Sequence, residues 1–236
     1  MQRRLFSYVL SLAAALTLTA ACTVVFLGIV CALQGEAPSG EPVVSATAAA
    51  FTVVVDAGHG GMDGGAVGTD SGVVEAGLNL SVASLLKEAL EAEGVVVIMT
   101  REDGEALADT KRGDMEARRD ILRRSDADLV VSIHMNKFTD RSVSGAMAYF
   151  MQGSAEGEAL AQAVIDSVCD AIGQKRRAAN PGDYFVIREC AVPAVLVECG
   201  FLSNAGDEKR LQDAAHQQAL SQAICAGILS YMEGKS

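Results

Sequence analysis

Short apolar runs alternate along this chain with longer segments in which apolar residues recur every three or four positions. Most of the runs are rich in β-branched residues, and the run at 145–151 contains two aromatic residues, both of which are typical of strands. The runs lie at residues 53–55, 95–100, 129–134, 145–151 and 193–198. The longer segments have the spacing of amphipathic helices and lie near residues 78–90, 111–124, 160–172 and 220–231. Because strands that alternate with helices need crossover connections, the pattern predicts one α/β domain whose mostly parallel, twisted sheet is flanked by helices on both faces.

Three local features refine this prediction. Gly94 follows the first helical segment, where a C-cap glycine is expected. The run at 95–100 shows no alternation, which predicts a strand buried on both faces. The sequence Asn180-Pro-Gly-Asp183 has the composition of a turn.

The first fifty residues differ from the rest. Arg3 and Arg4 precede an apolar run from residue 5 to residue 33, which exceeds the apolar core of a cleaved signal peptide and can span a bilayer, for which about 20 residues suffice. We expect residues 1–33 to form a transmembrane signal-anchor with a cytoplasmic N-terminus, and residues 34–50 to form a flexible linker. Residues 51–236 would then be an extracytoplasmic, membrane-anchored domain. A cleaved and exported form and a lipoprotein processed at Cys22 are the alternatives.

Charge and cysteine content narrow the class of protein. The net charge of −11 argues against nucleic acid as a partner, because phosphate backbones are bound by clustered Lys and Arg. Cys169 and Cys225 fall on helical segments and are interpreted as buried apolar residues. A disulfide between Cys190 and Cys199 stays open, since the spacing shows no dense disulfide framework.

The candidate chemistry gathers where strands end. Five of the eight residues from 58 to 65 are glycine, and His59 stands between two of them directly after the run at 53–55. His134 ends another such run, at the edge where open α/β sheets bind ligands. The glycine loop lacks both the third glycine of a dinucleotide fingerprint and the G-K-[ST] of a P-loop. We therefore interpret it as part of a metal site.

A catalytic zinc site takes three protein ligands and keeps one position open for water. His59 and His134 supply two nitrogens. Glu75 is our candidate for the third ligand, because it would lie in the first turn of a helix beside the glycine loop; alternatively, it only complements the helix dipole. Glu198 follows an apolar strand, where a carboxylate is costly to bury unless it is paired or near a metal. Polar groups at three strand ends can converge on one point.

Four motifs, in this order, resemble the zinc-dependent N-acetylmuramoyl-L-alanine amidases (amidase type 3 family) of bacterial cell-wall turnover. They are Asp56-Ala-Gly-His-Gly-Gly-Met-Asp-Gly-Gly-Ala66, Glu75 with Asn79-Leu80, Ser132-Ile-His-Met-Asn136 and Val197-Glu-Cys-Gly-Phe-Leu-Ser-Asn204. The resemblance covers residues 53–231. Residues 111–124 and 184–193 look closest to the germination-specific, spore-cortex branch.

The resemblance implies one Zn²⁺ per domain, held by His59, Glu75 and His134, with Glu198 as the catalytic carboxylate. It also implies the reaction, in which zinc-activated water hydrolyses the amide between the lactyl group of N-acetylmuramic acid and L-alanine of the peptidoglycan stem peptide. The expected partners are peptidoglycan, the bacterial membrane through the anchor and an activating protein. Ala76 stands where a lysine often follows the ligand glutamate, which puts substrate contact in doubt rather than metal binding.

Three other polar residues each have two possible roles, and a fourth is expected to have no functional role. Asp56 either fixes the tautomer of a metal-bound histidine or is a turn residue. Asn136 either contacts substrate or caps a turn. Arg188 could bind a substrate carboxylate, although an exposed arginine is the simpler interpretation, and His216 is interpreted as a surface residue.

Two other functions stay open. The first is a silent wall-binding or sporulation scaffold, which would keep the fold without activity. A silent relative would be free to lose catalytic residues, so the presence of His59, Glu75, His134 and Glu198 argues against this function. A zinc carboxypeptidase acting on the same peptides is the second, because the absence of H-E-x-x-H excludes only one class of zinc protease.

Overall fold

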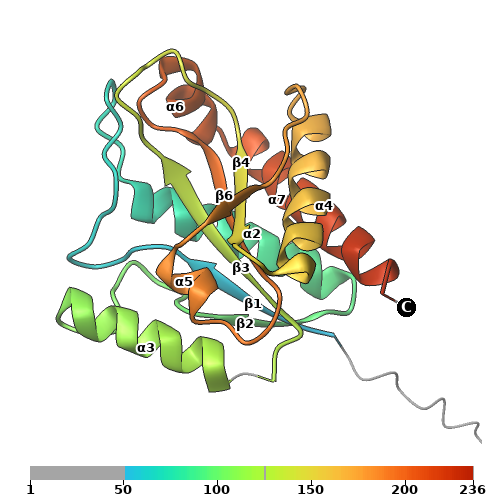
Figure 1. Ribbon diagram of the computed structural model, residues 1–236. Helices are drawn as coiled ribbons and strands as arrows, with labels where there is room; N and C mark the ends of the chain where they lie inside the picture. The colour runs from blue at the N-terminus through green and yellow to red at the C-terminus, as the bar shows by residue number, and fades with distance from the viewer. Residues whose placement is uncertain (1–50, 125, 236) are drawn as a thin grey trace, which may run out of the picture. The chain divides into compact units, whose positions relative to one another are not determined.

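Six strands form a single sheet in the order β2-β1-β3-β6-β4-β5 in the computed structural model, which describes residues 51–124 and 126–235 (Figure 1). The strands β2, β1, β3 and β6 run parallel, whereas β4 runs antiparallel to β6, with β5 parallel to β4. The strand bounds are β1 Thr52–Ala57, β2 Val96–Met99, β3 Leu129–Asn136, β4 Met147–Met151, β5 Asn180–Gly182 and β6 Ala194–Phe201. The helix bounds are α2 Glu75–Ala92, α3 Lys111–Arg124, α4 Ala155–Ala171, α5 Phe185–Arg188, α6 Ala205–Leu211 and α7 Ala214–Glu233.

Helices cover both faces of the sheet. Val53 and Val55 belong to the larger apolar cluster, with α2, α4 and α7, whereas Val54 between them belongs to a smaller cluster with α3 and α5. Successive strand residues point to opposite faces, so a run of valines without polar alternation suits a strand buried on both sides. The mostly parallel α/β sheet predicted from the sequence is confirmed.

The parallel strands bring three candidate residues together at their carboxyl ends. His134 in β3 lies in register with Glu198 in the neighbouring β6. His59 follows the end of β1, which pairs with β3 through Ala57 and Ile133. By the two-residue period of a strand, Glu198 points to the same face as Leu196, the face of α3 and α5.

Three local predictions differ from the structure. β2 is an edge strand whose Val96 is exposed, so the predicted burial on both faces is wrong. The predicted turn at Asn180 forms the short strand β5 at the opposite edge. β6 continues beyond Glu198 to Phe201, because the chain stays paired with β3 past the end of its apolar run.

Other local predictions hold. Gly94 has a positive φ of 79° directly beyond the C-cap of α2, a conformation that glycine adopts without the penalty of a side chain. Cys169, Cys190, Cys199 and Cys225 are all free, so the pairing of Cys190 with Cys199 left open above is not made.

The predicted membrane-anchored localisation needs correction. No helix among residues 51–124 and 126–235 is long and apolar enough to cross a membrane. The predicted anchor at residues 1–33 and the linker at 34–50 lie outside the described residues. This finding contradicts the anchored, extracytoplasmic localisation, which we withdraw.

Candidate metal centre

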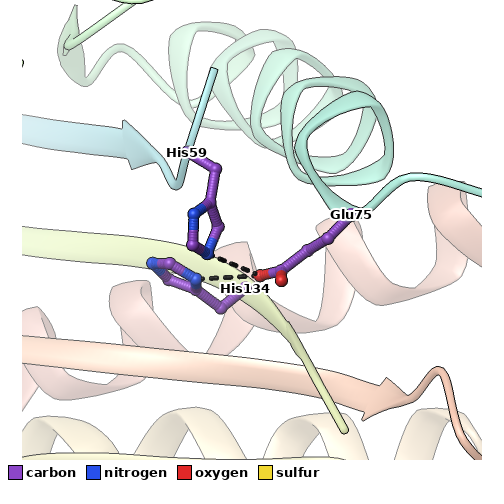
Figure 2. Close-up of side chains that lie close together, drawn as sticks. All are labelled: His59, Glu75 and His134. Carbon is purple, nitrogen blue, oxygen red and sulfur yellow. Dashed lines mark hydrogen bonds and ion pairs between the residues drawn. The ribbon is translucent and has the colours of Figure 1, made fainter. Parts of the chain in front are cut away.

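His59, Glu75 and His134 come from three separate elements and converge on one point (Figure 2). His59 lies on the glycine loop after β1, Glu75 is the first residue of α2, and His134 lies in β3. One oxygen of Glu75, Oε1, lies 3.3 Å from His59 Nε2 and 3.0 Å from His134 Nδ1. The three residues each offer a ligand atom within 4.8 Å of the other two.

This spacing fits a zinc ion. Ligand atoms about 2 Å from a tetrahedral metal lie roughly 3.3 Å from one another, and two histidines with one glutamate form a known catalytic donor set. The same contacts also serve as hydrogen bonds when the metal is absent.

The Glu75 carboxylate is held from several sides. Its Oε2 accepts a hydrogen bond from the Ala66 amide at 2.7 Å. Its Oε1 accepts from the Met135 amide and from Asn79 Nδ2, each at 3.2 Å. Burial raises the pKa of Glu75, but hydrogen bonds and charge from His134 and His59 outweigh that effect and hold the pKa well below its usual range. Glu75 is therefore ionised and oriented as a metal ligand requires.

Two glycines are required because side chains of the site occupy the space beside them. A Cβ on Gly58 would lie 2.2 Å from His134 Cε1, and one on Gly65 would lie 2.5 Å from Glu75 Oε2. Gly65 also has a φ of 70°, which favours glycine. The loop thus lets the backbone approach the ligands closely.

Asp63 is a site residue that sequence reasoning missed. Its Oδ2 lies 3.2 Å from His59 Nδ1, the ring nitrogen opposite the one that faces Glu75, and 3.0 Å from Lys111 Nζ. A carboxylate in this position fixes the tautomer of a metal-ligating histidine. Its place four residues after His59, within the first motif, was the available signal.

The charges of these carboxylates act on His59. Burial lowers the pKa of His59, but Glu75 and Asp63 outweigh this effect and raise it above its ordinary value. Burial raises the pKa of Asp63, whereas Lys111, His59 and the Gly65 amide lower it to about 2. Because a ligating histidine must be neutral at the atom that binds the metal, this raised pKa favours the proton in its competition with a metal at His59.

Glu198 is buried beside the ligand cluster without a neutralising partner. It is 8% exposed, and its Oε2 has no hydrogen-bond partner among the described residues. Burial raises its pKa to about 7, and the Glu75 charge also raises it, against a lowering by His134 and His59. A carboxylate with such a pKa can both take up and release a proton near neutral pH.

The other predicted residues have different surroundings. Asp56 bonds no histidine; it accepts from Arg118 Nη1 at 2.7 Å, Thr100 Oγ1 at 2.8 Å and Ser132 Oγ at 2.6 Å. Asn136 lines the site, and its Oδ1 accepts from the Lys137 amide at 2.8 Å.

Arg188 and His216 lie apart from the ligand cluster. Arg188 pairs with Asp183 at 2.6 Å and does not line the pocket around the cluster. His216 lies near the start of α7. Neither residue is brought to the metal centre.

The cluster opens into a pocket of about 410 Å³, a volume suited to part of a substrate molecule. One part of its lining is charged and contains the ligands, Glu198, Lys111 and Lys137. The other part is apolar and comes from Met115, Tyr184, Phe185, Val186 and Leu196. Sequence reasoning did not single out this apolar wall.

Comparison with known proteins shows which sequences this chain is similar to. A sequence profile described as N-acetylmuramoyl-L-alanine amidase matches residues 53–230. An uncharacterized protein of Bacillus subtilis (strain 168), YqiI, is 34% identical over 209 residues, which cover 87% of this chain and 94% of the relative. The germination-specific N-acetylmuramoyl-L-alanine amidase of the same organism is 32% identical over 192 residues, covering 78% of this chain and 80% of the relative.

Among solved structures, the CwlD amidase from Clostridioides difficile, determined in complex with the GerS lipoprotein, superposes with a TM-score of 0.75. It is 32% identical to this chain, and the match covers 78% of this chain and 99% of that one. The similarity therefore spans nearly the whole of the solved domain.

Proposed function

The chain belongs to the N-acetylmuramoyl-L-alanine amidase family, and from this premise we propose that it is a zinc-dependent peptidoglycan hydrolase. The bond cleaved is the amide between the lactyl carbonyl of N-acetylmuramic acid and the amino group of L-alanine in the stem peptide. The observation that carries the zinc proposal is the convergence of His59, Glu75 and His134 beside the buried Glu198.

Each residue has a defined part in the proposed site. His59 Nε2, Glu75 Oε1 and His134 Nδ1 would hold one zinc ion, and Asp63 would orient the His59 ring through Nδ1. When bound, zinc supplies Lewis-acid chemistry, since it lowers the pKa of water to about 7 and polarises a carbonyl.

Glu198 supplies the proton transfer. As a carboxylate it accepts a proton from the attacking water, and as a carboxylic acid it returns that proton to the departing amine. The products are a free lactyl carboxylate and a stem peptide with a free L-alanine amino group. Its burial and raised pKa support both halves of this cycle.

The similar proteins support a proposal for the type of peptidoglycan that is cleaved and for a protein partner. We propose spore-cortex peptidoglycan as one substrate, because a germination-specific amidase is among the similar proteins. The CwlD amidase was solved in complex with a lipoprotein, which supports an activating protein partner for this chain also.

Mass spectrometry of the digestion products tests the reaction. We expect zinc-loaded protein acting on purified peptidoglycan to release intact stem peptides that begin with a free L-alanine. Loss of a C-terminal residue from the stem peptide would instead identify a carboxypeptidase. If the protein binds zinc but releases no product, even when the proposed activating protein is added, the silent scaffold would be favoured.

A further inference from the structure

Two buried guanidinium groups lie behind the loop that carries His59. Arg118 extends from α3 and is 1% exposed, and Arg101, directly after Thr100, is 4% exposed. Arginine is rarely buried to this extent unless its charge is compensated. Arg118 is compensated by Asp56 at 2.7 Å and by Asp114 at 2.8 Å.

The two arginines donate hydrogen bonds to every backbone carbonyl from residue 57 to residue 59. Ala57 O accepts from Arg118 Nη1 at 2.8 Å and from Arg101 Nε at 2.9 Å. Gly58 O accepts from Arg101 Nη2 at 3.0 Å, and His59 O accepts from Arg118 Nη2. Because the carbonyls of residues 58 and 59 belong to the two peptide groups that flank His59, the guanidinium groups fix the backbone on both sides of this residue.

The backbone of His59 needs such support. His59 has a φ of 62°, the one positive value outside glycine among residues 51–124 and 126–235. A left-handed conformation is unfavourable for a residue that carries a side chain, and it persists only where its surroundings determine it. If the guanidinium groups of Arg101 and Arg118 did not hold these carbonyls, we expect the backbone of His59 to leave the left-handed conformation and the imidazole to turn away from Glu75.

Arg101 also links two of the ligands. Its Nη2 donates to Ala76 O at 2.8 Å as well as to Gly58 O. Ala76 follows Glu75 in the first turn of α2. One guanidinium nitrogen therefore connects the loop that carries His59 to the helical turn that carries Glu75.

We propose that Arg101 and Arg118 are positioning residues that hold His59 and Glu75 in ligand geometry before the metal binds, and so set the affinity of the site for zinc. This inference rests on the zinc site proposed above. The two arginines act on the ligands through backbone carbonyls and not through the reacting atoms.

The test is zinc affinity, measured on the metal-free protein by competition with a chromogenic chelator. We expect Arg118→Lys to weaken zinc binding about 10–100-fold, as the loss of groups that orient metal ligands does, because lysine keeps the charge but cannot reach the four separated acceptors of Arg118. Arg101→Lys is measured in the same way, so that the test stands if one variant fails to fold.

Two control variants separate positioning from folding. Arg112→Lys changes an arginine of the same helix whose side chain is 89% exposed, and we expect wild-type affinity. Leu160→Ala removes a fully buried side chain of the α4 core, which lowers the melting temperature through the cavity it leaves and does not alter the loop. Its zinc affinity should stay within about twofold of wild type while the protein is folded.

Chemical rescue gives a second readout. In Arg118→Ala, millimolar guanidinium chloride should restore zinc affinity, whereas ammonium chloride at the same concentration should not. Wild-type affinity in both lysine variants, or an equal loss in Leu160→Ala, would remove the positioning role while leaving the zinc site intact. If the wild-type protein itself binds no zinc, the proposed metal centre and this inference both fail.

Discussion

At the scale of single residues, His59 has a different partner on each ring nitrogen. Nε2 faces Glu75 Oε1 at 3.3 Å, and Nδ1 faces Asp63 Oδ2 at 3.2 Å. A hydrogen bond from Nδ1–H to the carboxylate leaves Nε2 free to bind a metal. Asp63 therefore bears on zinc affinity without being a ligand.

We expect Asp63→Asn to weaken zinc binding about 10–100-fold at pH 8. Asp63 also raises the pKa of His59, so a proton competes with zinc at a higher pH in the wild type than in the variant. As pH falls, wild-type affinity declines first, and the gap between the two proteins should narrow by pH 6. Chelator competition at both pH values measures this, with the exposed Asp170→Asn as the matched control. An unchanged affinity at pH 8 would show that Asp63 does not orient His59.

The raised pKa of Glu198 makes the zinc-free protein sensitive to pH. The pKa is 4.5 in the unfolded chain and about 7 in the folded one, so the stability that the protonated group provides is complete below pH 4.5 and is lost as pH rises through 7. Glu198→Gln mimics the protonated form. The free energy of unfolding of the variant should match that of the wild type near pH 4.5 and exceed it by roughly 3 kcal/mol at pH 8.

Urea unfolding of chelator-treated protein at several pH values measures that difference. The surface variant Glu158→Gln provides the baseline. A stability gap that stays constant with pH would mean that Glu198 is not held in a desolvated site.

Local sequence carries much of this site and omits specific parts of it. His59, Glu75, His134 and Glu198 are visible because each lies at or just after the end of an apolar run, or begins a helix, within a recognisable motif. For Asp56 the sequence leaves open a histidine partner or a turn role, but the side chain bonds Arg118 of α3. That contact joins residues 62 positions apart, and no spacing rule along the chain reports it.

At the scale of elements, a glycine of the loop after β1 and a glycine of α2 differ in the space that is available for a side chain. Gly58 is packed against the His134 ring, whereas Gly77 is exposed in the first turns of α2, and a Cβ there would meet nothing within 4 Å. The same substitution should therefore have opposite effects at these two positions.

We expect Gly58→Ala to displace the His134 imidazole and to lower zinc affinity by at least about tenfold. Gly77→Ala should instead stabilise the protein by about 0.5–1 kcal/mol, because alanine loses less conformational entropy in a helix than glycine. Zinc titration and thermal unfolding of both variants give the two results. Normal zinc affinity in Gly58→Ala would place His134 elsewhere in solution.

The longer strands and helices follow from the apolar pattern, whereas the short helices α5 and α6, the short strand β5 and the order of the strands do not. The run at Val53 predicted β1 because valine without polar alternation fits a doubly buried strand. The run at Val96 looks the same, yet β2 lies at the sheet edge, since strand order depends on pairing between distant segments. β5 was hidden because Pro181 and Gly182 are typical of turns.

At the scale of the whole molecule, the candidate metal centre lies at the carboxyl ends of the inner parallel strands β1, β3 and β6. The larger apolar cluster is formed by strand residues with α2, α4 and α7. The fold therefore does not depend on zinc for its main source of stability.

We expect chelation to leave the protein folded and to lower its melting temperature. Free zinc at one hundred times its dissociation constant adds about 2.7 kcal/mol to stability, which corresponds to about 5–10 °C for a domain of this size. Differential scanning calorimetry with zinc and with chelator measures the shift. Complete unfolding on chelation would instead mark the zinc as structural.

The most direct measurement compares wild-type protein with Glu198→Gln for zinc content and for release of stem peptides from peptidoglycan. We predict about one zinc per chain in both proteins. Stem peptides with free L-alanine amino groups should appear in the wild type alone, with release falling at least about a hundredfold in the variant. Release at the wild-type rate by Glu198→Gln, or a wild-type protein without zinc that still releases stem peptides, would contradict this account.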